Sequence, residues 1–332
     1  MKTLAIIGGG SWGTALAIVL APRFEQVRLW VYESDLAVRI RDTRENDLYL
    51  PGFTIPTNVE ITSAIPVTLD HAEIVLSVVP SHLVRTIYQQ MLPSLQDGML
   101  FVSATKGLEI ESLLRPSEII SEVVSARVAP RVAVISGPTF AREVAASSPT
   151  ALVVASMDEG LTECVQRAFA GPSFRLYTSP DPVGVEIGGS VKNVVAIGAG
   201  VVHGMSLGHN SLAALITRGL AEITRLAEAL GGQPKTLSGL AGLGDLVLTC
   251  TGELSRNRAV GMELARGRKL DEIIGSMRMV AEGIKTTSAA VELARRSGVE
   301  MPITEQMFQM LHFGLAPREA VRRLMERSLR GE

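Results

Sequence analysis

Short, uninterrupted runs of β-branched and other apolar residues alternate with longer amphipathic segments along the first half of the chain. A strand that is covered on both faces needs no polar side, so such runs are typical of a parallel sheet with helices on both faces. We therefore predict a parallel, doubly wound sheet. The predicted strands cover residues 4–7, 27–32, 74–79, 100–104, 132–136, 152–155 and 174–177.

The pattern changes near residue 180, where strand-like runs stop and apolar residues recur at helical spacing. Asp181 followed by Pro182 is a helix start signal, because a carboxylate caps free N–H groups and proline suits the first helical position. We expect an α/β domain over residues 1–180 and an all-α C-terminal domain over residues 181–332. The clearest helical periods cover residues 212–230, 259–266, 285–296 and 319–329.

Gly8, Gly10 and Gly13 form a G-x-G-x-x-G pattern directly after the first predicted strand, where a predicted helix begins. Glycines there allow a tight turn and close approach of a pyrophosphate, and the helix N-terminus offers N–H groups to the anion. Glu33 follows Gly13 by 20 positions, where an acidic group would accept hydrogen bonds from a ribose. We expect an NAD(P)-binding, Rossmann-type domain, the alternative being a tight turn without a ligand.

Glu33 favours NAD over NADP, because its carboxylate would repel a 2′-phosphate. Arg28 and Arg39 could still reach such a phosphate. The preference between the two cofactors therefore stays open at this point.

Three lysines, Lys106, Lys192 and Lys285, lie in apolar stretches where lysine is sparse. Lys106 follows a predicted strand at the edge of the sheet where such folds bind ligands. Lys192 has glycine and valine neighbours on a predicted helix, and desolvation there would shift it toward its neutral form and suit it to proton transfer. The alternative is a lysine whose ammonium reaches solvent along an apolar surface.

Asp245 follows a glycine-rich bend and either caps a helix or presents a carboxylate to the site. Ser255, Arg256 and Asn257 stand at a predicted helix start, where backbone N–H groups, a guanidinium and an amide would together bind an anion. The five histidines show no ligand spacing, so no metal is expected. These residues indicate hydride transfer to a small phosphorylated or carboxylated carbonyl.

The composition limits which binding partners and which cellular compartment we expect. The formal net charge of −2 provides no basic field for nucleic acid or an anionic membrane. Cys164 and Cys250 form no C-x-x-C motif, which fits a reducing, cytoplasmic location. Residues 193–217 lack charged side chains over a length that could span a membrane, but they include four glycines and two histidines. We expect core helices there and no stable membrane insertion.

Six motifs together resemble bacterial NAD(P)-dependent glycerol-3-phosphate dehydrogenase, in the order and spacing of that family. They are SATKGLE at 103–109, SGPTFA at 136–141, GGSVKN at 188–193, GLGDL at 242–246, SRNR at 255–258 and VAEG at 280–283. The resemblance implies reversible reduction of dihydroxyacetone phosphate to sn-glycerol 3-phosphate for glycerophospholipid synthesis. It also implies a homodimer.

The resemblance carries roles to particular residues. Lys192 is implied as the acid/base, with Asp245 orienting its ammonium and Lys106 adding positive potential. The implied substrate contacts are Lys106, Gly137, Thr139, Lys192, Asp245, Ser255, Arg256 and Asn257. The implied cofactor contacts, beside the three fingerprint glycines and Glu33, are Ser11, Trp12, Tyr32, Lys106, Ala141, Arg256, Val280 and Glu282.

One position departs from the family. Relatives often carry a basic residue near the position of Tyr32, and this chain has none there, which argues against a strong NADP preference. Two other functions remain as alternatives: a related 2-hydroxy-acid or sugar-phosphate dehydrogenase with the same domain plan, and a module that senses NAD without turnover. Lys192, Asp245 and Arg256 speak against the second.

Overall fold

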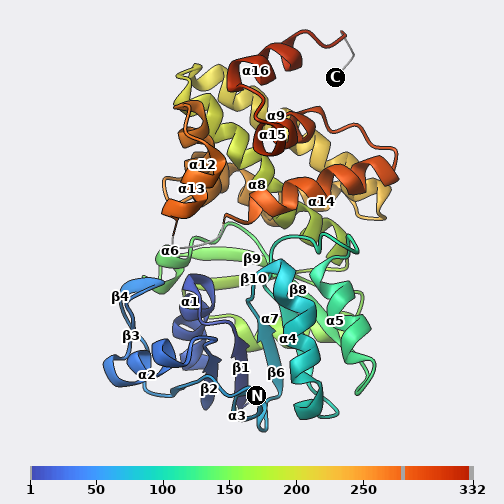
Figure 1. The fold of residues 1–332 in the computed structure, drawn as a ribbon. Coiled ribbons are helices and arrows are strands. Elements are labelled where there is room, and N and C mark those ends of the chain that lie inside the picture. Colours follow the sequence, from blue (N-terminus) through green and yellow to red (C-terminus); the bar gives the residue numbers. More distant parts are fainter. Residues whose placement is uncertain (1, 278–280, 329–332) are drawn as a thin grey trace. The chain divides into compact units, whose positions relative to one another are not determined.

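The computed structural model describes residues 2–277 and 281–328. The chain divides into two compact units, one formed by Met1–Lys106 with Leu114–Glu186 and the other by Gly107–Leu113 with Ile187–Glu332. The first unit is an α/β layer structure and the second is helical (Figure 1).

An eight-stranded sheet forms the centre of the first unit, in the order β10-β9-β8-β7-β6-β1-β2-β5. All seven predicted strands are confirmed, each within a few residues of its expected bounds. The strands are β1 (Thr3–Ile7), β2 (Gln26–Trp30), β5 (Val59–Thr62), β6 (Ile74–Ser77), β7 (Leu100–Ser103), β8 (Val132–Ser136), β9 (Thr150–Ala155) and β10 (Phe174–Ser179).

The sheet is parallel except at one pair, because β9 runs antiparallel to β8, with Ile135 opposite Val154. The prediction of a fully parallel sheet is therefore wrong for β9 and β10. Residues 137–149 connect β8 to β9 and contain the short helix α6 (Ala141–Ala145). This connection does not return the chain along the sheet, so β9 begins at the end of the sheet where β8 finishes. The longer α7 (Glu159–Phe169) does return the chain, and β10 is parallel to β9.

Three short strands were not predicted. The edge strand β5 contains Glu60, which interrupts its apolar run and pairs with Arg28 on β2. The other two, β3 (Glu45–Asn46) and β4 (Leu50–Thr54), form a separate antiparallel hairpin. The strand β3 has only two residues, and Pro51 and Gly52 interrupt the pattern of β4.

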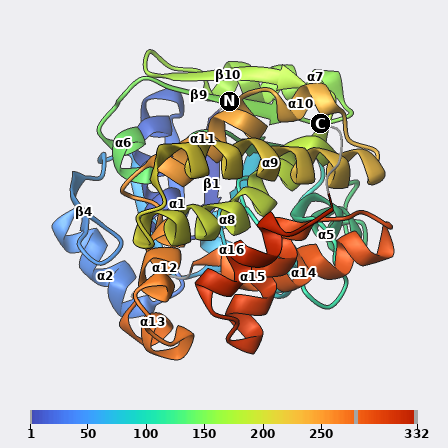
Figure 2. The same ribbon diagram turned by 90° about the horizontal axis from the view of Figure 1, so that it is seen from above.

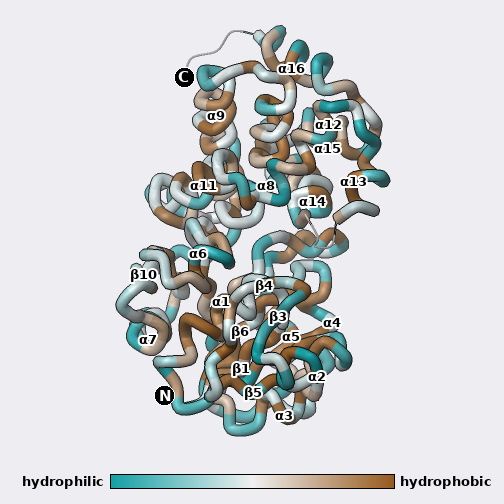
Figure 3. Tube along the Cα trace, turned by 90° about the vertical axis from the view of Figure 1, so that its left-hand side faces the viewer, coloured by the Kyte–Doolittle hydropathy of each residue, from teal (hydrophilic) through white to brown (hydrophobic). Residues whose placement is uncertain are grey.

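Alternate residues of β1 enter two different cores, which explains why its run is uninterrupted. Leu4 and Ile6 pack on one face and Ala5 and Ile7 on the other. Hydrophobic residues accordingly run through the middle of the sheet (Figure 3). The first core is covered by α1 (Ser11–Leu20), α2 (Ser34–Thr43), α6 and α7, and the second by α3 (Ile65–Leu69), α4 (Val84–Met91) and α5 (Pro116–Val124).

The remaining α-helices belong to the second unit, apart from the start of α8, and α14, α15 and α16 lie side by side (Figure 2). The predicted helical periods fall on α9, α12, α14 and α16, although residue 329 lies outside the described residues. The helices are α8 (Pro182–Gly204), α9 (Gly208–Ala229), α10 (Pro234–Leu237), a π-helix (Leu240–Gly244), α11 (Asp245–Thr251), α12 (Arg256–Ala265), α13 (Leu270–Ser276), α14 (Glu282–Arg296), α15 (Pro302–Phe313) and α16 (Pro317–Met325).

The long helix α8 begins as predicted, since Asp181 Oδ1 accepts a hydrogen bond from the Gly184 N–H at 2.8 Å. It is long and apolar enough to cross a membrane, yet 94% of its most apolar stretch is buried inside the protein. The expectation of a core helix is therefore confirmed for α8. It is wrong for the first half of α9, where Ala213 and Ala214 are exposed.

Two glycines let α8 and α12 touch through their backbones. A Cβ on Gly200 would lie 2.0 Å from the Arg258 carbonyl oxygen, and one on Gly261 would lie 1.9 Å from the Ile197 carbonyl oxygen. This close crossing fixes the start of α12, with the residues Ser255–Asn257, against the helix that carries Lys192.

Candidate active site

The glycine-rich turn after β1 can be built only from glycine at two of its positions. Gly8 has φ +124°, and a Cβ on it would lie 2.6 Å from the Val78 carbonyl oxygen. A Cβ on Gly13 would lie 1.8 Å from the Gly8 carbonyl oxygen, so α1 packs directly on the turn. At both positions glycine therefore lets backbone segments of the protein approach one another closely, which gives the tight turn that the fingerprint predicts.

Gly10 differs, because a Cβ on it would meet no described atom within 4 Å. It occupies the N-cap of α1, and no side chain caps that helix end. Ser11 and Trp12 follow in the first turn, where backbone N–H groups have no intrahelical partner. Open space beside an uncapped helix N-terminus fits the pyrophosphate of a dinucleotide.

Tyr32 and Glu33 follow β2, as predicted for the ribose end of a dinucleotide site. Tyr32 is 74% exposed and meets Trp30 edge-on, with ring centroids 6.0 Å apart. Glu33 is exposed and accepts a hydrogen bond from the Tyr49 hydroxyl at 2.8 Å.

The two arginines considered for a 2′-phosphate are both engaged by carboxylates. Arg28 pairs with Glu60 at 3.1 Å, and Arg39 pairs with Asp47 at 2.9 Å. Neither guanidinium is held ready for a ligand phosphate.

Lys106 stands three residues beyond β7, and its ammonium donates to the Gly137 carbonyl at 3.3 Å. Thr139 also donates to that carbonyl, at 3.1 Å. The structure therefore brings these three predicted substrate residues together at the ends of β7 and β8. Ala141, the first residue of α6, is partly buried.

Lys192 and Asp245 form a buried ion pair in the second unit, with side chains 6% and 1% exposed. The Lys192 ammonium also donates to the Thr249 hydroxyl at 2.9 Å. That hydroxyl donates in turn to the Asp245 backbone carbonyl at 2.6 Å. The ammonium is thus oriented by two side chains of one helix, α11.

The π-helix explains how Asp245 reaches Lys192. Short π-segments recur at functional sites, because they shift the register of the residues that follow. A Cβ on Gly242 would lie 2.1 Å from the Leu237 carbonyl oxygen, and one on Gly188 would lie 2.8 Å from the Ala241 carbonyl oxygen. These glycines let the bend press against α8 and place Asp245 at the first position of α11.

The predicted anion site lies at the start of α12. Ser255 is the N-cap, and its hydroxyl accepts from the Arg258 N–H at 3.2 Å. Arg256 is exposed and lies within electrostatic reach of Glu282, the first residue of α14. Asn257 is buried and accepts from the Gly283 N–H at 3.0 Å, which joins the starts of α12 and α14. Val280, an expected cofactor contact, lies outside the described residues.

One lysine lies outside the predicted surroundings, and two polar residues of the site were not predicted. Lys285 is exposed on α14, so the prediction that it lies in apolar surroundings is wrong. Thr249 lies one helical turn after Asp245, a spacing that could have drawn attention to it. Tyr49 carries no such signal, because its contact with Glu33 depends on the unpredicted hairpin.

Other chemistry has little support in the described residues. Residues 2–277 and 281–328 contain no cluster of three or more His, Cys, Asp or Glu side chains that could hold a metal ion. Burial raises the pKa of the Cys250 thiol to about 12, which keeps it unreactive.

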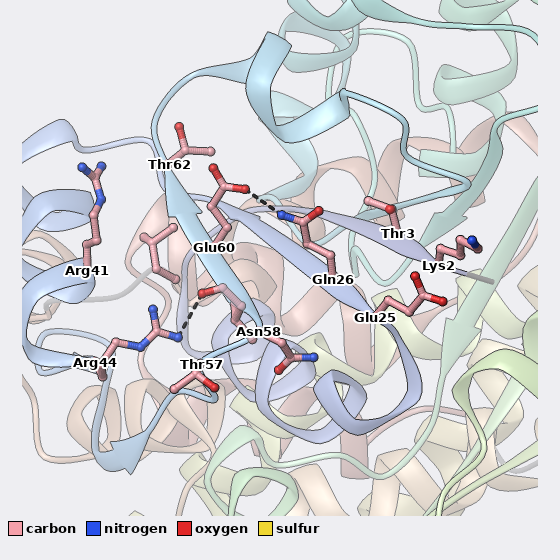
Figure 4. Close-up of a pocket in the computed structure, with 12 residues that line it drawn as sticks. Lys2, Thr3, Glu25, Gln26, Arg41, Arg44, Thr57, Asn58, Glu60 and Thr62 are labelled. Atoms are coloured by element: carbon pink, nitrogen blue, oxygen red, sulfur yellow. Dashed lines mark hydrogen bonds between the residues drawn. The ribbon is translucent and has the colours of Figure 1, made fainter.

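A polar hollow on the first unit contains none of the predicted site residues (Figure 4). Two of its polar side chains bond to other lining residues, Gln26 to Glu60 at 3.0 Å and Arg44 to the Val59 carbonyl at 2.9 Å. It therefore offers no rival arrangement of reactive groups.

Comparison with known proteins gives the same assignment over both units. The family model for the N-terminus of NAD-dependent glycerol-3-phosphate dehydrogenase matches residues 3–162, and the model for its C-terminus matches residues 181–322. The glycerol-3-phosphate dehydrogenase (NAD(P)+) of Koribacter versatilis is 58% identical over 98% of this chain and 98% of its own. That of Geobacter sulfurreducens is 50% identical over 100% and 99%.

A solved structure supports the same relationship. The glycerol-3-phosphate dehydrogenase of Coxiella burnetii is 40% identical, with a TM-score of 0.94 over 98% of this chain and 99% of that one. The chain therefore belongs to the family of NAD-dependent glycerol-3-phosphate dehydrogenases.

Proposed function

We propose that the chain is an NAD(P)-dependent sn-glycerol-3-phosphate dehydrogenase. It would transfer a hydride reversibly between NAD(P)H and dihydroxyacetone phosphate, giving sn-glycerol 3-phosphate for glycerophospholipid synthesis. The observation that carries this proposal beyond family membership is the buried Lys192 ammonium, held by Asp245 and Thr249. A binding module without turnover has no need of a buried, oriented proton donor.

The first unit supplies the residues that would hold the dinucleotide. Gly8, Gly10 and Gly13 with the N-terminus of α1 would bind the pyrophosphate, flanked by Ser11 and Trp12. Tyr32 and Glu33 would meet the adenosine end, and we assign further cofactor contacts to Lys106, Ala141, Arg256 and Glu282. When bound, the cofactor supplies the hydride.

Lys192 supplies the proton in the direction of carbonyl reduction. As the carbonyl carbon gains a hydride, negative charge develops on its oxygen, and a proton from Lys192 Nζ converts that oxygen to a hydroxyl. Asp245 keeps the ammonium oriented while it is charged. The neutral amine is then reprotonated from water, and the reverse reaction uses the same amine as the base.

Residues remote from the reacting carbon would hold the substrate phosphate. Arg256 offers a guanidinium, and Ser255 and Asn257 flank it at the start of α12. Lys106, Gly137 and Thr139 would complete the contacts from the first unit. Binding energy from the phosphate would then fix the carbonyl for transfer.

The test compares carbonyl substrates with one purified enzyme. We expect NADH or NADPH oxidation to be much faster with dihydroxyacetone phosphate than with pyruvate, oxaloacetate or unphosphorylated dihydroxyacetone. Equal rates with 2-oxo acids would instead favour a hydroxy-acid dehydrogenase. Cofactor binding without turnover of any of these compounds would favour a sensing module.

We further propose that residues 1–180 act as the cofactor domain and residues 181–332 as the catalytic domain of a cytoplasmic homodimer. Two free thiols without a disulfide are compatible with a reducing compartment. Light scattering coupled to gel filtration tests the oligomeric state, because a monomer mass near 35.4 kDa would contradict the dimer.

A further inference from the structure

The Glu33 carboxylate is held by a residue from outside its own strand and helix. Glu33 occupies the N-cap position of α2, and its Oε1 accepts from the Tyr49 hydroxyl at 2.8 Å. Tyr49 lies between β3 and β4, in a hairpin that is not part of the main sheet. The carboxylate that follows β2 therefore has a specific partner.

Tyr49 is itself fixed to the glycine-rich turn. Its backbone N–H donates to Asn46 Oδ1 at 3.1 Å. Asn46 is fully buried, and its Nδ2 donates to the Gly9 carbonyl and to the Thr14 hydroxyl, both at 2.8 Å. A continuous path of hydrogen bonds thus joins the turn that would bind the pyrophosphate to the carboxylate that would bind the ribose.

The Tyr49 ring packs against the core of the first unit, so its hydroxyl has little freedom to move. Burial and the hydrogen bond to Glu33 both raise the pKa of the Tyr49 phenol, which keeps it protonated and donating at neutral pH. Glu33 remains an acceptor of fixed orientation, and a carboxylate has several lone pairs left for the hydroxyl groups of a ribose.

The same hairpin also forms an ion pair with Arg39, a nearby residue of α2. Asp47 pairs with Arg39 at 2.9 Å, while the other candidate arginine, Arg28, pairs with Glu60 at 3.1 Å. A 2′-phosphate at this place would meet the negative charge of Glu33, and both arginines would have to leave their carboxylates to compensate it.

We propose that Tyr49 is a positioning residue which, by fixing Glu33 as an acceptor, makes this chain prefer NAD(H) to NADP(H). The inference rests on the proposed function only in taking a nicotinamide dinucleotide as the ligand of the first unit. It assigns a specificity role to the β3–β4 hairpin.

The experiment measures binding without a carbonyl substrate. Dissociation constants of ADP-ribose and 2′-phospho-ADP-ribose are determined by calorimetry, and those of NADH and NADPH by fluorescence. The full-length chain is compared with Tyr49→Phe, which removes one hydroxyl, and with Glu33→Gln, which removes the charge. Tyr177→Phe, at a tyrosine of β10 that is 46% exposed, serves as the matched control.

We expect the unmodified chain to bind ADP-ribose at least about tenfold more tightly than its 2′-phosphate, the scale of a lost hydrogen bond to a charged group. Glu33→Gln should bring the ratio close to one. Tyr49→Phe should lower it several-fold while the melting temperature stays unchanged, and Tyr177→Phe should leave the ratio as it is.

Equal or tighter binding of the 2′-phosphate by the unmodified chain would overturn the proposal. So would a Tyr49→Phe variant with an unchanged ratio, because Tyr49 would then only support the fold. Failure to reduce dihydroxyacetone phosphate would instead remove the proposed function, and the binding ratio would still be measured.

Discussion

Lys192 and Asp245 stand 53 positions apart in the chain and meet as a buried ion pair. Taking two charges out of water costs several kcal/mol per ion, which their attraction offsets only when geometry and further hydrogen bonds are favourable. Thr249 provides such a bond to the ammonium at 2.9 Å. A buried pair of this kind is a poor way to gain stability, and it fits the proposed role of Lys192 as a proton donor.

The first prediction concerns Lys192→Ala. We expect kcat to fall by roughly 10²–10⁴-fold, the usual contribution of a general acid, while the dissociation constant of NADH stays within about twofold. The cofactor residues of the fingerprint belong to the first unit and Lys192 to the second, so binding should survive. Steady-state kinetics and a fluorescence titration measure the two quantities. A raised KM with unchanged kcat would contradict the assigned role.

The second prediction concerns the partner of that lysine. Asp245→Asn leaves a buried ammonium without its counter-charge, so we expect the free energy of unfolding to fall by roughly 3–5 kcal/mol. Glu228→Gln, at an exposed carboxylate of α9, should change it by less than about 0.5 kcal/mol. Urea denaturation of the three proteins measures both differences. Equal effects of the two substitutions would mean that the Lys192–Asp245 pair makes no specific contribution to the free energy of unfolding.

Strands β1, β6, β7, β8 and β9 could be predicted because they are covered on both faces and therefore read as apolar runs. The direction of β9 could not, because it depends on the path of the connection from β8 and not on the residues of the strand itself. The edge strand β5 was missed for a different reason. Glu60 is accommodated there by pairing with Arg28, a contact between strands that are far apart in sequence.

In the site, too, the local sequence indicated single residues, whereas their contacts with residues far along the chain could not be predicted from it. Lys192 stands out from its apolar neighbours, and Asp245 from the glycines before it, but only the fold reveals that they pair. Arg39 was considered for a ligand phosphate, whereas the β3–β4 hairpin engages it through Asp47. That hairpin contains a strand of only two residues, too short to produce a periodic pattern.

The third prediction compares two glycines of the fingerprint. A methyl group on Gly10 meets no described atom within 4 Å, so Gly10→Ala should change the free energy of unfolding by less than about 1 kcal/mol. It should nevertheless weaken NADH binding at least tenfold, because the methyl group would occupy the place of the pyrophosphate. Gly13→Ala places a Cβ 1.8 Å from the Gly8 carbonyl oxygen and should lower both stability and binding. Unchanged NADH affinity in Gly10→Ala would refute the placement of the cofactor.

The fourth prediction concerns the phosphate of the substrate. Arg256→Ala should raise KM for dihydroxyacetone phosphate by roughly 10–100-fold, the range expected for losing hydrogen bonds to a charged group. Arg268→Ala, at another guanidinium of the second unit, should leave KM unchanged, because Arg268 pairs with Glu263 at 2.9 Å. Initial rates at varied substrate concentration measure both. If KM does not move in Arg256→Ala, the start of α12 is not the phosphate site.

The last prediction uses a carboxylate far from the chemistry. Glu222 on α9 is 2% exposed. Although it is far from α15 in sequence, it caps the start of that helix, because its oxygens accept from the Ile303 N–H at 2.6 Å and from the Thr304 N–H at 3.1 Å. Burial raises the pKa of Glu222 above its ordinary value of 4.5, and these hydrogen bonds oppose the shift without cancelling it.

A carboxyl group with a higher pKa in the folded chain binds more protons there than in the unfolded chain. The contribution of the Glu222 carboxyl group to stability is therefore complete below pH 4.5. It is lost as the pH rises through the pKa of Glu222 in the folded chain. Glu222→Gln has no titratable group at this position. The unmodified chain should therefore lose free energy of unfolding between about pH 4.5 and pH 8 while the variant does not. The deficit of the variant relative to the unmodified chain should shrink over that range. Urea denaturation across that range, with Glu228→Gln as the exposed control on the same helix, measures the change. A deficit that grows with pH would mean that the hydrogen bonds to the ionised carboxylate outweigh its burial.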